Sequence, residues 1–122
     1  ANLPFQHKRS MQLASKNRFI AAQFYALLKN DYWKQLASKT NSLATYCAKK
    51  LAGIHNTQAA YPVETNMVFL AMSAARFNKL QKMAHFYRWD EERKEVRLVF
   101  SLSNTRADID HFLEAYKRTF LQ

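Results

Sequence analysis

The chain has 122 residues, with 19 lysines and arginines against 9 acidic residues, 48% hydrophobic residues and 14% aromatic residues. This length suits one domain, and the apolar content is too high for an intrinsically disordered chain. Cys47 is the single cysteine, which excludes a disulfide-stabilised scaffold. No apolar run approaches the roughly 18 residues of a membrane span, and no signal segment opens the chain. We therefore expect a soluble, cytoplasmic domain without a membrane partner.

The scarcity of glycine and cysteine restricts the chemistry that the chain can perform alone. Gly53 is the single glycine, which excludes the glycine-rich loops that bind phosphate groups in P-loop and dinucleotide-binding proteins. Cysteine clusters are absent and the histidines are scattered, so no metal site is predicted. These histidines are His7, His55, His85 and His111. Phosphate or metal chemistry would have to come from another part of the protein.

The positive charge is concentrated in the first half of the chain. Residues 1–60 carry nine lysines and arginines against one acid, Asp31, whereas residues 61–122 carry ten against eight acids. A basic surface is typical of nucleic-acid binders. The basic residues here stand mostly singly, however, without a long basic run or the aromatic signature of an RNA-recognition module. Both a nucleic-acid surface and a surface that faces solvent or a partner protein fit this pattern.

Two helices are predicted at the start of the chain. The first covers about residues 9–29 and carries apolar residues at helical spacing. These residues are Leu13, Ile20, Phe24, Leu27 and Leu28. Asn30 and Asp31 should end this helix and cap the next one. The second helix should stop at Gly53 in a left-handed conformation, and its apolar stripe includes Cys47, which we predict to be a buried thiol rather than a nucleophile.

The rest of the chain is predicted to form three short strands and two further helices. The strands cover residues 65–70, 86–89 and 96–102, with a charged hairpin turn at 90–94. Ser73 should cap one helix, and Thr105-x-x-Asp108 is a capping-box-like start to the other. The order α-α-β-α-β-β-α predicts an α+β fold, with helices packed on a small, mainly antiparallel sheet.

Arg97 is an unusual residue for the middle of the last strand. Alternation places Val96 and Leu98 on the main apolar face and Arg97 on the other face. A strand with only a structural role would more often carry threonine or valine there. A guanidinium matches a carboxylate or a phosphate through two parallel hydrogen bonds. Two interpretations follow: Arg97 pairs with a nearby acid of the chain, or it binds the carboxylate of a ligand.

Three stretches together resemble the low-specificity L-threonine aldolases, a family of lyases that depend on pyridoxal phosphate (PLP). His7–Gln23 resembles the segment that leads out of the family's large domain, and Pro62–Phe69 resembles the first strand of the family's small domain. Val96–Ser101 and Asp108–Leu113 resemble the last strand and the last helix of that small domain. Their order and spacing agree over almost the whole chain. The pair Thr65–Phe69 and Val96–Val99 is the most specific part.

The resemblance implies an organisation in which this chain is one part of an enzyme. Residues 1–30 would form a helix that links to an absent N-terminal large domain, and residues 31–122 would form a C-terminal small domain of the type found in fold type I PLP enzymes. The complete enzyme would cleave L-threonine into glycine and acetaldehyde in a retro-aldol reaction that uses PLP as cofactor. The implied partners are the large domain, further copies in a homo-oligomer and an amino-acid substrate, and nucleic acid is not expected.

The resemblance also assigns roles to two arginines. Arg97 matches the family's small-domain arginine that binds the substrate α-carboxylate, and Arg18 resembles an arginine near the cofactor phosphate, although a surface role fits Arg18 equally well. The Schiff-base lysine, the residue that stacks on the pyridine ring and its acidic partner have no counterpart here. Lys16 lies in a predicted helix, without the strand and loop that such a lysine requires. We therefore expect the chain alone to hold no catalytic residue and no PLP, to be inactive, and to self-associate through exposed apolar surface.

Two other hypotheses remain open at this stage. In the first, the chain is a basic α+β binding module for nucleic acid or for regulation. In the second, it is the small domain of another fold type I PLP enzyme, such as a β-eliminating lyase. Binding of DNA or RNA with a steep salt dependence would favour the first hypothesis. The second is not separable by sequence, because substrate choice lies mostly in the missing domain.

Overall fold

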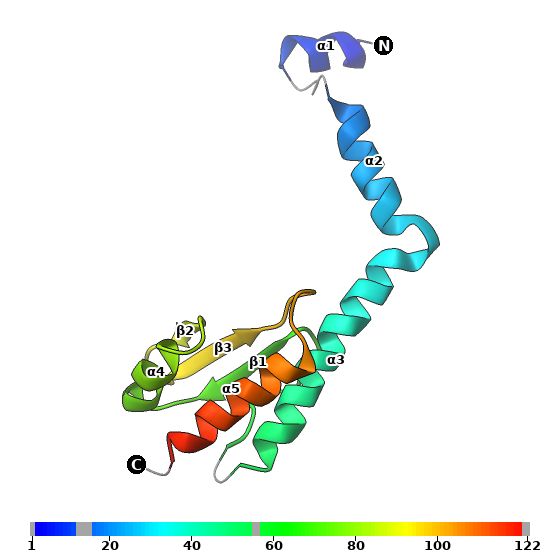
Figure 1. Cartoon of the computed structure of the whole chain (residues 1–122). Coiled ribbons are helices and arrows are strands. Elements are labelled where there is room, and N and C mark those ends of the chain that lie inside the picture. Colours follow the sequence, from blue (N-terminus) through cyan, green and yellow to red (C-terminus); the bar gives the residue numbers. More distant parts are fainter. Residues whose placement is uncertain (1, 12–15, 55–56, 121–122) are drawn as a thin grey trace. The chain divides into compact units, whose positions relative to one another are not determined.

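The chain folds into two compact units, and the computed structural model describes its residues 2–11, 16–54 and 57–120. The units are Ala1–Gln35 and Leu36–Gln122, and Figure 1 traces the chain through both. In the described part of the chain, no helix is both long enough and apolar enough to span a membrane.

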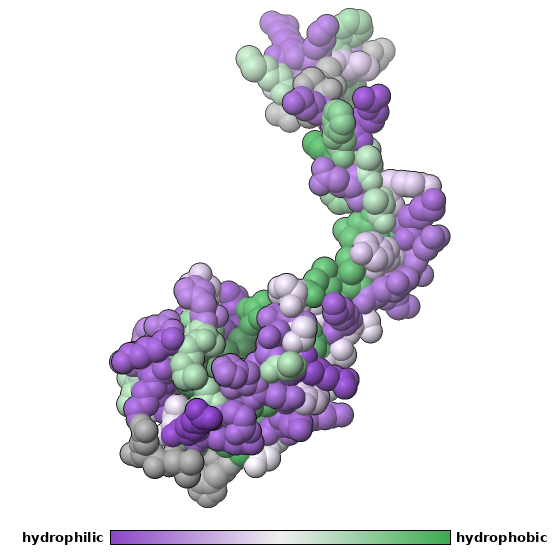
Figure 2. All heavy atoms as spheres, in the orientation of Figure 1, coloured by the Kyte–Doolittle hydropathy of each residue, from purple (hydrophilic) through white to green (hydrophobic). Residues whose placement is uncertain are grey.

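The first unit is helical. Helix α1 spans Leu3–Arg9, helix α2 spans Asn17–Leu28, and a short 3-10 helix, η1, spans Lys29–Asp31. Neither α1 nor α2 buries a side chain within the described chain. The apolar residues predicted to form the core face of α2, such as Phe24, are exposed, and Figure 2 shows apolar surface in green along this helix.

The prediction of one helix over residues 9–29 is wrong at its start. Ser10 and Met11 form a turn after α1, and α2 begins at Asn17. Met11 has a φ of 54°, a left-handed value that a right-handed α-helix excludes. The apolar periodicity of the sequence therefore continues past a residue at which the helix is interrupted. Leu13, which belongs to the predicted stripe, lies outside the described residues.

The predicted end of this helix is confirmed. Asn30 and Asp31 have φ values of 55° and 54°, and the next helix begins directly after them. Asparagine and aspartate adopt left-handed values more readily than most residues, because their short polar side chains bond to the local backbone. These two residues therefore separate α2 from the following helix.

The remaining elements form an α+β arrangement with a three-stranded sheet. The elements are α3 (Tyr32–Ala52), β1 (Met67–Ala71), α4 (Ala74–Gln81), β2 (Tyr87–Asp90), β3 (Glu95–Val99) and α5 (Arg106–Arg118). The strand order is β1-β3-β2, and both pairs are antiparallel. The predicted fold class is confirmed, with one more helix at the start than expected. The first two strands lie within two residues of their predicted bounds.

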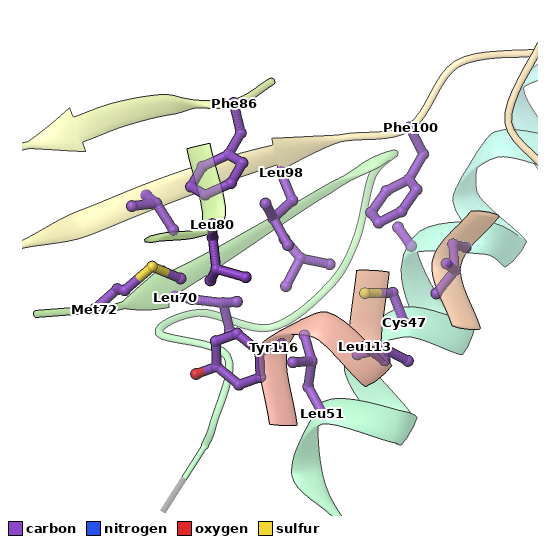
Figure 3. Close-up of a cluster of buried hydrophobic side chains, with 14 of the residues drawn as sticks. Cys47, Leu51, Leu70, Met72, Leu80, Phe86, Leu98, Phe100, Leu113 and Tyr116 are labelled. Carbon is purple, nitrogen blue, oxygen red and sulfur yellow. The ribbon is translucent and has the colours of Figure 1, made fainter. Parts of the chain in front are cut away.

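The sheet buries one of its faces under the helices. The buried residues are Val68 and Leu70 of β1 and Val96 and Leu98 of β3. The side chains of the residues between them project from the opposite face of the sheet. Figure 3 shows Leu70 and Leu98 directed toward side chains of α3 and α5. The helical side of this core includes Leu43, Ala44, Cys47, Leu51, Leu80, Ile109, Leu113 and Tyr116. Helices α3, α4 and α5 therefore cover the same face of the sheet.

The helix caps predicted at Ser73 and Thr105 are confirmed, whereas no side-chain cap by Asn30 or Asp31 is seen in the described residues. The Thr105 Oγ1 accepts a hydrogen bond from the Asp108 N–H (3.2 Å), and the Asp108 carboxylate accepts one from the Thr105 N–H (2.7 Å). The hydrogen bonds from the Thr105 side chain and backbone hold the pKa of the Asp108 carboxyl below its usual value. At the start of α4, Ser73 Oγ accepts from the Arg76 N–H at 3.4 Å. These caps satisfy N–H groups that have no partner inside the helix.

Two boundaries differ from the predictions. Helix α3 ends before Gly53 as expected, but Gly53 does not have a left-handed φ; its N–H donates to a carbonyl oxygen three residues earlier at 3.2 Å. The conformation at this position therefore does not require glycine. Strand β3 ends at Val99 and does not continue to residue 102. Its end is explained by the Asn104 Oδ1, which accepts a hydrogen bond from the Ser101 N–H (2.7 Å) and stabilises a turn before α5.

Cys47 is fully buried in α3, which confirms its predicted structural role. Burial raises the pKa of this thiol from the usual 9.0 to about 12, because the thiolate would lose its hydration. A thiol that stays protonated at neutral pH is a poor nucleophile. Cys47 therefore contributes to packing.

We expect Cys47 to lower the stability of the fold at alkaline pH. Between pH 9 and pH 12 the unfolded chain loses the thiol proton while the folded chain keeps it. The free energy of unfolding should therefore fall by up to about 1.4 kcal/mol per pH unit in that range. Urea unfolding at pH 8 and pH 10, compared between the protein and its Cys47→Ala variant, separates this effect from that of lysines and tyrosines. A stability difference that is equal at both pH values would contradict a buried, protonated thiol.

Candidate anion site on the open face of the sheet

Arg97 lies at the centre of the sheet face opposite the one that helices α3, α4 and α5 cover. In the antiparallel register, Arg97 of β3 lies between Phe69 of β1 and Tyr87 of β2. Alternate residues of a strand share a face, so these side chains leave the sheet opposite the buried core. We call this side the open face; it carries Phe69, Tyr87, Trp89, Glu95, Arg97 and Val99.

The guanidinium of Arg97 is oriented by an aromatic ring and has no acidic partner among the residues that the structure describes. Its Cζ lies 4.6 Å from the centroid of the Trp89 ring, and its Nε is buried without a hydrogen-bond partner. Within the described parts of the chain, the ion pairs involve other arginines and a lysine, and none involves Arg97. Stacking uses the flat face of the guanidinium and leaves its N–H edge for hydrogen bonding. Such a group is suited to bind a carboxylate or a phosphate in two hydrogen bonds.

A row of aromatic rings supports this stack. Trp89 makes an edge contact with Phe69, with ring centroids 5.6 Å apart, and Phe69 makes a similar contact with Tyr61 at 5.6 Å. Trp89 lies in the irregular step of β2 between residues 88 and 90, where the pairing with β3 shifts. Irregular steps of this kind redirect a side chain. The Trp89 ring contacts Arg97 from this irregular step.

Glu95 is the acid of β3 on the open face, and it is engaged by other groups. It is only 7% exposed. The Tyr61 hydroxyl donates to its carboxylate, at 3.1 and 3.3 Å from the two oxygens, and accepts a hydrogen bond from Arg93 Nη1 at 2.9 Å. The hydrogen bond to Tyr61, followed by electrostatic interactions with Tyr61, Asp90 and Glu95, raises the pKa of Arg93 above its usual value. The carboxylate of Glu95 is therefore bound to Tyr61 and not to Arg97.

Arg18, the second predicted site residue, lies in the first unit. It is exposed on α2, with its Cζ 5.4 Å from the centroid of the Phe19 ring. Arg18 and Arg97 belong to different units, so the structure does not define a site that contains both. The described residues contain no group of histidines, cysteines and acids that could hold a metal ion, and His55 lies outside them.

The lysines of the chain do not fit PLP. All eleven are exposed. A lysine that forms a Schiff base at neutral pH needs a lowered pKa, which burial or a neighbouring cation provides. Lys16 is exposed immediately before α2. The described residues therefore do not build a PLP site by themselves.

The sequence patterns assigned no function to Tyr61, Glu95 or Trp89. Tyr61 and Glu95 are 34 positions apart in the chain, so no local motif joins them. The strand that holds Trp89 was predicted, but its irregular step depends on pairing with β3 and has no signature in the sequence. The only available signal was Arg97 itself, a charged residue in an apolar strand.

The amino-acid sequence of this chain is similar to those of known proteins. No protein-family model matches the chain. The low-specificity L-threonine aldolase of Pseudomonas aeruginosa is 35% identical over 77 residues, which are 63% of this chain and 22% of that protein. An enzyme of the same name from another Pseudomonas is 32% identical over 106 residues, 76% of this chain and 31% of that protein. This chain is related to the low-specificity L-threonine aldolases.

The fold agrees with this relationship. A solved structure of the threonine aldolase from Leishmania major is similar to 80% of this chain, with a TM-score of 0.69 and 21% sequence identity. At that identity the likeness shows the fold alone, which is that of a part of a threonine aldolase. The matched parts amount to between 22% and 31% of the lengths of these three aldolases. The resemblance stated from the sequence is confirmed, and most of an aldolase's length has no counterpart in this chain.

We expect nuclear magnetic resonance to detect the stack of Arg97 on Trp89. The ring current of Trp89 should move the Arg97 Nε–H proton upfield, and burial should slow its exchange with water. Both effects should disappear in Trp89→Leu. They should persist in Trp33→Leu, which removes the other tryptophan, in α3. A Trp89→Leu spectrum with an unchanged Arg97 signal would contradict the stack.

Proposed function

We propose that this chain is the C-terminal domain of a PLP-dependent, L-threonine aldolase-like lyase. The complete enzyme would cleave L-threonine into glycine and acetaldehyde by a retro-aldol reaction. The relationship to two low-specificity L-threonine aldolases supports the reaction class. The chain covers less than a third of their length, so the Schiff-base lysine and the groups that hold PLP would lie in the missing large domain.

The unpaired guanidinium of Arg97 is the observation that carries this proposal. In it, Arg97 binds the α-carboxylate of the amino-acid substrate through the N–H edge that Trp89 leaves free. The bound carboxylate would fix the orientation of the substrate relative to the catalytic groups of the large domain. An arginine whose role is structural would more commonly be paired with an acid of its own chain.

Exposed apolar surface supports a missing partner domain. In the first unit, the apolar side chains of α2 are exposed, including Phe19 at 58% and Phe24 at 61%. On the open face, Trp89 is 54% exposed and Val99 is 52% exposed. Surfaces of this kind are normally covered in a complete protein. We propose that residues 1–30 link to the large domain, that the open face turns toward the substrate site, and that the complete enzyme is a homo-oligomer.

Arg18 has a separate role in the proposal. It would contribute to binding the PLP phosphate, in the same subunit or in a neighbouring one. Its exposure on α2 supports this role, because a guanidinium with free N–H groups can bind a phosphate. Without the large domain the chain would be inactive.

A chimeric enzyme tests the proposal. In it, this chain replaces the matching segment of the Pseudomonas aeruginosa aldolase, and acetaldehyde release from L-threonine is measured. We expect an active chimera, in which Arg97→Ala lowers kcat/KM by roughly a hundredfold or more, because two charge-assisted hydrogen bonds are lost. Arg97→Lys should retain part of the activity.

The matched control for this experiment is Arg118→Ala, which removes an exposed arginine from the last turn of α5. We expect this variant to keep the kcat/KM of the chimera. An Arg97→Ala chimera as active as its parent would overturn the carboxylate role. A folded chimera that binds nucleic acid but releases no acetaldehyde would favour the binding-module hypothesis.

A further inference from the structure

Arg97 has a potential intramolecular partner that it does not use. Glu95 lies two positions before Arg97 in β3, so both side chains leave the strand on the open face. Residues spaced in this way are roughly 6.6 Å apart along a strand, a distance that two long side chains can bridge. The carboxylate is buried, and a buried charge strongly favours an ion pair. The absence of this pair therefore requires a cause.

The hydrogen bonds of Tyr61 provide that cause. Its hydroxyl donates to the Glu95 carboxylate and at the same time accepts from Arg93, which supplies the balancing positive charge. Arg93 also lies 3.8 Å from Asp90, which is the register partner of Glu95 on β2. The carboxylate is thus satisfied by groups other than Arg97.

The Tyr61 ring is itself fixed on the open face. It packs edge-on against Phe69, the residue that lies opposite Arg97 in the register. The chain before β1 is attached to that strand by the Ala60 N–H, which donates to the Phe69 carbonyl at 2.7 Å. Tyr61 therefore reaches Glu95 from a segment that is bonded to β1, while its ring contacts Phe69.

We propose that Tyr61 is a positioning residue that keeps Arg97 free for a carboxylate ligand by holding Glu95 away from it. This inference rests on the proposed function of Arg97. Without the Tyr61 hydroxyl, Glu95 turns along the strand and forms an ion pair with Arg97. An external carboxylate then has to displace an internal one, which weakens its binding.

The test uses the full chain labelled with nitrogen-15 and the Arg97 Nε–H signal. Four proteins are compared: the unaltered chain, Tyr61→Phe, Glu95→Gln and the double variant. Without any ligand, Tyr61→Phe should move the Arg97 Nε–H proton downfield as the ion pair with Glu95 forms. The double variant should return the signal to its original position, because glutamine carries no charge.

A titration with L-threonine, compared with L-threoninol, which lacks the carboxylate, measures binding. We expect a dissociation constant in the millimolar range for the unaltered chain and for Glu95→Gln, and roughly tenfold weaker binding for Tyr61→Phe. The double variant should bind as the unaltered chain does.

Tyr87→Phe is the matched control, since Tyr87 also lies beside Arg97 but its hydroxyl is 3.4 Å from His85 and not bonded to Glu95. It should change neither the signal nor the binding. If Tyr61→Phe fails to fold, Arg93→Gln serves as the second variant and should move the Arg97 signal in the same direction by a smaller amount.

The two proposals fail in different ways. An Arg97 signal that is unchanged in Tyr61→Phe, or one that stays shifted in the double variant, would overturn the role of Tyr61. Binding of L-threonine and L-threoninol with equal strength by the unaltered chain would instead count against the carboxylate role of Arg97, and the ligand-free spectra would still decide the role of Tyr61.

Discussion

Arg97 places a positive charge in the middle of a small sheet, and no acid of the described residues pairs with it. The guanidinium of Arg97 stacks on Trp89, and its buried Nε has no hydrogen-bond partner. A cation over an aromatic ring gains about 0.5–2 kcal/mol, which orients the group without using its N–H donors. The terminal Nη donors, unlike the buried Nε, therefore remain for an anion from outside.

The one-sided burial of the sheet explains why such a group is accessible. Helices α3, α4 and α5 contribute their apolar residues to the same core, and Val96 and Leu98 are buried there. The opposite face keeps exposed aromatic rings around a charge, a combination typical of a surface that meets another part of a protein. In the proposed function, that face meets the large domain of an aldolase, which corresponds to the part of these relatives that the chain does not match.

The sequence predicted those parts of the fold that depend on local patterns. Alternation in β3 placed Arg97 opposite the core, the spacing of Thr105 and Asp108 predicted the cap of α5, and the apolar stripe of α3 located buried Cys47. Each of these patterns acts within a few residues.

The wrong predictions of the helix start and the strand end also share a physical reason. Periodicity extended one helix through the left-handed Met11, and alternation extended β3 beyond Val99, because neither pattern registers where the backbone turns. The hydrogen bond between Tyr61 and Glu95 joins residues 34 positions apart, so tertiary folding alone creates it. The sequence could thus locate the candidate site through Arg97, but it could not predict which residues surround Arg97.

The most direct measurement is a crystal structure of this chain joined to an aldolase large domain with an amino acid bound. We expect the substrate carboxylate to accept two hydrogen bonds from the Arg97 guanidinium, while the Glu95 carboxylate stays bonded to Tyr61. A carboxylate bound by other residues, with Arg97 paired to an acid of its own chain or turned away from the ligand, would contradict this expectation.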